Sequence, residues 1–168
     1  IWYRLLHNKL PYKALLNRFI PAFFTSSACR ICENPMEDYS HFLLYCPIKM
    51  TFWQIIWKEY VNSAEHAVSP STVLIALLTL TLQPSLNNPG TVPALLAIGT
   101  ALESIWVSHW AYTFNDVPFT VSNTLTIFNR KINRYQQELL ISSGRQHKPY
   151  NLENIFQFAS QSDGISLL

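Results

Sequence analysis

The sequence predicts an all-α fold, a helical bundle with a small knuckle rich in cysteine and histidine near the N-terminus. Apolar residues recur at helical spacing through most of the 168 residues. Glycine is rare, with 4 residues, whereas proline is frequent, with 10, as expected of helices separated by proline breaks. The 3 cysteines all fall within residues 29–46, which also contain a histidine.

The composition indicates one domain-sized core with a sparsely charged surface. A chain of this length can bury a sizeable core. Charged residues make up 13% of the chain, about half of the roughly 25% typical of globular proteins, and such a surface favours a partner. Residues 1–60 carry seven Lys or Arg and four acids, whereas residues 61–120 carry three acids and no Lys or Arg. Positive charge is therefore concentrated in the N-terminal third.

The knuckle, residues 29–46, has the pattern C-x2-C-x8-H-x4-C, formed by Cys29, Cys32, His41 and Cys46. Zinc prefers four thiolate or imidazole ligands in a tetrahedron, and a tight turn aims a C-x2-C pair at one point. Residues five apart on a continuous α-helix lie roughly 140° apart. Cys46 is therefore expected just beyond a helical turn that starts at His41, with Pro47 supplying the break.

Buried thiols or a disulfide at the knuckle are weaker alternatives to a metal site. Free cysteines are often buried, so three core cysteines and a core histidine could produce the same composition. A disulfide would leave one of the three cysteines unpaired, and x2 spacing suits a metal better. Glu37 lies between the two pairs and could replace a ligand, but four ligands are already present. A closed set of four protein ligands predicts a structural zinc, since a catalytic zinc keeps one open position.

The first sixty residues outside the knuckle are expected to form three helices. Apolar stripes predict one helix up to Leu10 and a second that starts at Pro11. The side chains expected to face inward in these two helices are Trp2, Leu5, Leu6, Leu10, Leu15, Leu16, Phe19 and Ile20. A strongly aromatic third helix follows Pro47, from Met50 to Tyr60. It is expected to be core, because a base-stacking platform would interleave exposed aromatics with basic residues.

The middle of the chain is expected to be a buried helical hairpin. Ser69 and Pro70 suit an N-cap and the first helical position, followed by an apolar helix from Val73 to Leu82. A loop over 83–90 precedes a helix from Pro93 to Tyr112. A membrane hairpin over 73–102 is the alternative, but each apolar run is about half the ~20 residues needed to span a bilayer. His109 is expected to be a packed or capping histidine.

A long amphipathic helix is predicted from Thr120. Its narrow apolar seam recurs at alternating steps of four and three and consists of Val121, Leu125, Phe128, Ile132, Tyr135 and Leu139. Packing of this seam against helices of the same chain is favoured over a coiled coil. The expected domains are a zinc knuckle with flanking helices (1–62), a helical region packed on it (63–141) and a polar, partly disordered tail (142–168).

The sequence argues against autonomous catalysis and against secretion. It has no Gly-rich phosphate loop, no G-x-S-x-G elbow and no H-E-x-x-H motif. Its ten acids form no paired constellation of the kind that two-metal phosphoryl chemistry needs. The first twenty residues mix basic with apolar residues, unlike a signal peptide. Thiols that are not paired suggest a reducing compartment, so an intracellular location, nuclear or cytoplasmic, is expected.

The first sixty residues contain an ordered set of motifs that extends the knuckle on both sides, namely Trp2, Lys9-Leu10-Pro11, Cys29, Cys32, Glu37-Asp38, His41-Phe42-Leu43, Cys46-Pro47 and Phe52-Trp53. On these motifs, residues 1–60 resemble the reverse-transcriptase zinc-binding domain, which lies C-terminal to the polymerase in LINE-type non-LTR retrotransposon proteins. Residues from Ile105 onward are similar to the helical region that often follows this domain. The resemblance implies that Cys29, Cys32, His41 and Cys46 bind zinc. It also implies an accessory role to an element-encoded polymerase.

The polymerase is not part of this chain, because no Asp-Asp dipeptide occurs in it. The chain is therefore expected to be a fragment or remnant that binds RNA or DNA. Basic side chains near the knuckle are the candidate phosphate contacts, namely Arg30, Lys9, Lys13, Arg18 and Lys49. Phe42 or Tyr45, if exposed, could stack on a base. The alternative function is a zinc-stabilised protein-interaction module that docks a polymerase domain.

Overall fold

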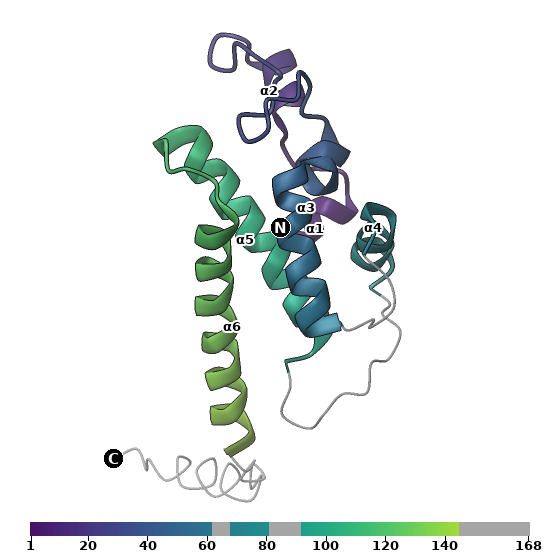
Figure 1. Ribbon diagram of the computed structural model, residues 1–168, viewed down its shortest axis with the longest axis vertical. Coiled ribbons are helices and arrows are strands. Elements are labelled where there is room, and N and C mark those ends of the chain that lie inside the picture. Colours follow the sequence, from purple (N-terminus) through teal and green to yellow (C-terminus); the bar gives the residue numbers. More distant parts are fainter. Residues whose placement is uncertain (62–67, 81–91, 145–168) are drawn as a thin grey trace, which may run out of the picture. The chain divides into compact units, whose positions relative to one another are not determined.

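The protein is all-α, as the sequence predicts. The computed structural model describes residues 1–61, 68–80 and 92–144, and these contain helices and turns but no strand. The elements in chain order are α1 (Trp2–Leu6), α2 (Lys13–Phe19), the π-helical turn η1 (His41–Tyr45), α3 (Pro47–Ile56), the π-helical turn η2 (Trp57–Val61), α4 (Pro70–Thr79), α5 (Ala94–Asn115) and α6 (Val121–Gly144) (Figure 1).

The aromatic helix after the knuckle, α3, lies at the centre of the core. Phe52, Trp53 and Ile56 are buried on one stripe of α3, which packs against α5 and η1. The Trp53 indole Nε1 donates a hydrogen bond to the Leu43 carbonyl, 3.0 Å away. This bond satisfies a buried polar group and ties the core to the knuckle. The prediction that this helix is core rather than an exposed stacking platform is confirmed for these three side chains.

The predicted start of α4 is confirmed, whereas that of α2 is wrong. Ser69 caps α4 by accepting a hydrogen bond from the Thr72 amide, and Pro70 is the first helical residue. The loop expected over 83–90 lies outside the described residues. The second N-terminal helix begins at Lys13 rather than at Pro11. Lys13 is the only buried residue of this short helix, and Phe19 and Ile20, which were expected to face inward, are exposed.

The apolar seam of α6 packs as predicted in its first half. Phe128 and Ile132 are buried, and the Phe128 ring lies edge-on to those of Phe52 and Tyr60, with centroid distances of 6.1 and 5.3 Å. Residues Ile1–Arg134 form one compact unit and Tyr135–Leu168 a second. In the second unit α6 continues to Gly144, and the predicted tail from 145 onward lies outside the described residues. None of the described helices is long and apolar enough to cross a bilayer.

Candidate metal centre

The structure brings the four predicted ligands together. The ligand atoms of Cys29, Cys32, His41 and Cys46 all lie within 4.8 Å of one another. Cys29 and Cys46 are almost fully buried, and Cys32 is the most accessible of the three cysteines. The Cys32 Sγ lies 3.2 Å from the His41 Nε2. Three sulfurs and one imidazole nitrogen that converge in this way can bind a metal ion.

The first ligand pair is presented by a tight turn. The Glu33 amide donates to the Cys29 carbonyl at 2.9 Å, and the Cys29 amide donates to the Asn34 carbonyl at 2.9 Å. Glu33 closes the turn with a φ of 61°, in the left-handed region that few side chains adopt without cost. These contacts fold the chain back on itself, so both thiol groups face the same point.

The second ligand pair is joined by a single π turn. The Cys46 amide donates to the His41 carbonyl, five residues earlier, at 3.3 Å. Asp38 precedes this turn, and its carboxylate accepts from the His41 amide at 2.7 Å and from the Ser40 hydroxyl at 2.9 Å. The His41 amide therefore lowers the pKa of Asp38. Cys46 itself is extended, with ψ of 120°, and directly precedes α3, as predicted from Pro47.

The thiols share a proton unequally. A hydrogen bond from the Cys46 thiol lowers the pKa of Cys29 to about 3, because that bond stabilises the thiolate. The same bond raises the pKa of Cys46. Burial raises the pKa of Cys32. Thiolates are the metal-binding form of cysteine, so the hydrogen bond from Cys46 favours the metal-binding form of Cys29.

Lys49 was a candidate phosphate contact, and the structure corrects this prediction. Its side chain has 0% exposure, because residue 49 shares the inward stripe of α3 with Phe52, Trp53 and Ile56. The ammonium donates to the Phe42 carbonyl at 2.8 Å and lies 3.2 Å from His109 Nδ1 and 4.3 Å from the centre of the Phe42 ring. A lysine held this way cannot reach nucleic acid. Burial lowers its pKa, whereas Glu37 and the three cysteines oppose that shift.

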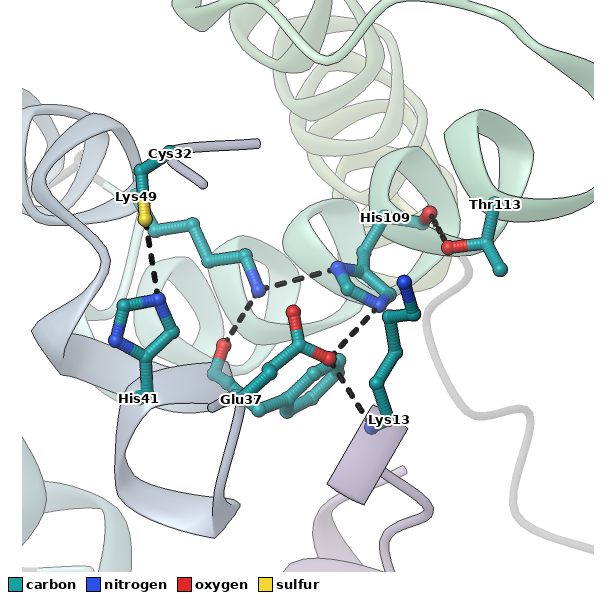
Figure 2. Close-up of polar contacts among 8 residues, drawn as sticks. Lys13, Cys32, Glu37, His41, Lys49, His109 and Thr113 are labelled. Carbon is teal, nitrogen blue, oxygen red and sulfur yellow. Dashed lines mark hydrogen bonds and ion pairs between the residues drawn. The ribbon is translucent and has the colours of Figure 1, made fainter. Parts of the chain in front are cut away.

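Glu37 and His109 form a buried polar cluster with Lys49 beside the candidate metal centre. In Figure 2, Lys49 and Glu37 approach the two sides of the His109 imidazole, with Glu37 Oε1 lying 3.3 Å from Nε2. Glu37 also accepts from the Lys13 amide at 3.2 Å, which satisfies a free N–H at the start of α2. Burial raises the pKa of Glu37 to about 7 and lowers that of His109 to about 2. His109 is thus packed, as expected from the sequence.

The other predicted basic residues are distributed differently. Lys9 and Arg18 are exposed, whereas Lys13 is almost fully buried. Arg30 crosses from the knuckle to the end of α5, where it donates to the carbonyls of Tyr112 and Thr113 and pairs with Asp116 at 2.7 Å. Arg30 therefore has a structural partner in this chain. Phe42 is buried and cannot stack on a base, whereas Tyr45 is exposed.

No protein-family model matches the sequence, and comparison with curated proteins and with solved structures gave no match either.

The position of Lys49 in the sequence indicates that its side chain is buried, although it was predicted to be a phosphate contact. Lys49 lies three, four and seven residues before Phe52, Trp53 and Ile56, the spacing of one helix face. A lysine on an apolar stripe predicts a buried ammonium with partners. Its partner His109 is 60 residues away in the chain, and no local pattern indicates that pairing.

Proposed function

We propose that this chain is a zinc-stapled helical module that contacts nucleic acid as a non-catalytic accessory part of a retrotransposon reverse transcriptase. The observation that carries the proposal is the convergence of the Cys29, Cys32 and Cys46 sulfurs and the His41 nitrogen within 4.8 Å. The link to reverse transcriptases rests on the resemblance of residues 1–60, including the order and spacing of these four ligands. The RNA or DNA bound would be that handled by the polymerase.

Zinc fits this ligand set best. Three thiolates and one imidazole are typical of closed structural zinc sites, in which bond lengths of roughly 2.0–2.3 Å place ligand atoms up to about 3.8 Å apart. The four ligand atoms, which lie within 4.8 Å of one another, would have to draw slightly closer to reach that spacing. A zinc ion with three thiolates carries one net negative charge, and the buried ammonium of Lys49 supplies the opposite charge nearby. A bound zinc ion would hold the C-x2-C turn against the η1 turn and α3.

Charge distribution supports contact with nucleic acid at the N-terminal third. Lys9 and Arg18 are exposed on this part of the chain and free to approach phosphates. Each phosphate contact releases counterions, so affinity should fall as the salt concentration rises.

The proposal is tested in two steps with the same reduced protein. Elemental analysis should return one zinc per chain. A filter-binding titration with single-stranded RNA and DNA at two salt concentrations should then show affinity that falls steeply with salt, and Lys9→Glu with Arg18→Glu should weaken it. Protein without metal would refute the zinc centre, and metal-loaded protein without salt-sensitive binding would refute the nucleic-acid role.

A second candidate function is docking of a polymerase domain. It is favoured by exposed apolar side chains on and next to α4, namely Ile75, Leu78 and Leu80. An apolar surface of this kind is typical of a protein contact. Ile75→Asp with Leu78→Asp should abolish co-purification with a reverse-transcriptase polymerase domain and leave oligonucleotide binding unchanged. Unchanged co-purification would exclude α4 as the docking surface.

A further inference from the structure

A cavity of ≈ 310 Å³ opens beside the knuckle, between the segment after α2 and the end of α5. Its lining combines basic, hydroxyl and aromatic side chains, namely Lys13, Phe23, Phe24, Thr25, Ser26, Arg30, Thr113 and Phe114. The volume is at the lower end of the roughly 300–1,000 Å³ range of small-molecule sites. It is enough for one flat ring with a polar substituent.

The charged part of this lining is cationic. Lys13 is almost fully buried, and no hydrogen bond or ion pair within the described part of the chain uses its Nζ. Arg30 lines the same cavity, while its guanidinium also holds Asp116, whose side chain is 80% exposed. No acidic side chain is among the lining residues. An ammonium that lines a cavity and has no anionic partner among the described residues favours a ligand that brings negative charge.

The aromatic part of the lining is unusually exposed. Phe23 is 85% exposed and Phe114 is 64% exposed, although both are large apolar side chains. Phe114 is held in place because its ring stacks on Trp110 at 5.4 Å and meets Phe24 edge-on at 6.0 Å. A rigid exposed ring next to basic groups is the arrangement that binds unpaired bases by stacking. The cavity therefore has the combination of exposed rings and basic groups that α3 lacks.

We propose that this cavity binds one nucleotide of a single-stranded nucleic acid, with the base stacked on Phe114 or Phe23 and the phosphate facing Lys13. The hydroxyls of Thr25, Ser26 and Thr113 supply further donors to the sugar and phosphate. The proposal rests on the nucleic-acid role proposed above. It adds where on the protein the nucleic acid binds and that the bound form is single-stranded. Stacking accepts every base, so the site is expected to show little sequence preference.

The test is fluorescence anisotropy of labelled oligo(dT) and oligo(U), about 12 nucleotides long, with the intact zinc-loaded chain. Phe23→Ala and Phe114→Ala should together weaken binding about 10-fold or more. Lys13→Gln should lower the slope of log affinity against log salt by about one. Tyr3→Ala is the matched control, because Tyr3 is 72% exposed on α1, away from the cavity lining, and should leave affinity unchanged. A free mononucleotide should compete only weakly, since it offers one contact where a strand offers several.

The outcomes separate this proposal from the function on which it rests. If the wild-type chain binds in a salt-sensitive way but the phenylalanine variants bind equally well, the cavity is excluded and the nucleic-acid role stands. Loss of binding in Tyr45→Ala alone would place the stacking site on the knuckle and likewise overturn the cavity. If Phe114→Ala weakens only the contact with a polymerase domain, the cavity is a protein contact. No binding by the wild-type chain would refute both proposals.

Discussion

The backbone amide of Cys46 donates a hydrogen bond to the carbonyl of His41, 3.3 Å away, and this contact closes the turn that brings the two side chains to the same side of the knuckle. On an α-helix the two residues would point roughly 140° apart. A π turn widens the helix so that residues five apart come close to register. Extended backbone at Cys46 completes the alignment, and α3 then begins at Pro47. Single π turns of this kind are frequent at functional sites.

Loss of one ligand should unfold the knuckle rather than merely weaken it. A structural zinc contributes much of the folding free energy of small sites, so Cys32→Ser should unfold residues 25–60. Zinc affinity should fall by more than the roughly 100-fold that is typical when a residue that only hydrogen-bonds to a metal ligand is replaced. Circular dichroism and zinc analysis measure both effects, and chelation of wild-type zinc should reproduce the spectrum. Met36→Ser, exposed in the same loop, is the control. A Cys32→Ser protein that melts like wild type would rule out a structural metal.

Lys49 should be essential to stability although it carries a charge. Lys49→Met leaves Glu37 and the thiolates without their buried cation, which is expected to cost about 3–5 kcal/mol of unfolding free energy. The control, Lys58→Met, removes an exposed lysine from the adjoining η2 turn and should cost less than about 0.5 kcal/mol. Urea denaturation of the zinc-loaded proteins makes the comparison. Equal losses in the two variants would show that Lys49 has no special role.

Glu37 should make the protein less stable as the pH rises. Burial raises its pKa from 4.5 to about 7, so the folded state holds a proton that the unfolded state releases. Its favourable contribution is therefore present below about pH 4.5 and is lost as the pH rises through about 7. Glu37→Gln removes this pH dependence. Between about pH 4.5 and pH 7, the unfolding free energy of the variant should rise relative to that of the wild type by up to about 3 kcal/mol. Parallel urea titrations at several pH values test this, and a constant difference between the proteins would contradict it.

Gly99 should resist replacement by alanine although it lies inside α5. A Cβ at this position would lie 2.7 Å from Trp2 Cζ3, and the Trp2 ring is anchored because its Nε1 donates to the Leu77 carbonyl at 2.7 Å. The clash should outweigh the roughly 1 kcal/mol that alanine gains over glycine in helix propensity. The unfolding free energy of Gly99→Ala should therefore fall by about 1 kcal/mol. In a Trp2→Leu background the same substitution should become stabilising. The measurement is the denaturation midpoint of the wild type, the two single variants and the double variant. If Gly99→Ala raises the midpoint both with and without Trp2, the contact between residue 99 and Trp2 is refuted.

The four candidate metal-binding side chains and most helices were predictable because their signals are local. Spacing of cysteine and histidine, a proline after Cys46, the Ser69 cap and the stripe of α3 each act within a few residues. The second helix was placed too early because its start was assigned to Pro11 as the first helical residue, whereas Tyr12 is the N-cap. The inward prediction for Phe19 and Ile20 failed because a two-turn helix carries too few apolar positions to set its phase.

By itself the sequence determined an all-α fold with four candidate metal-binding residues at one knuckle, since helical periodicity and the spacing of these residues need no distant partner. Only the tertiary structure decided which charges are available to a ligand. Lys49 meets His109 across 60 residues and Arg30 meets Asp116 across 86, so two predicted phosphate contacts became internal ones. Burial and pairing of a charge depend on segments that approach only in the folded state, where desolvation makes an unpaired charge costly. The same approach of distant segments leaves Lys13 beside Phe114 in a cavity that no local pattern contains.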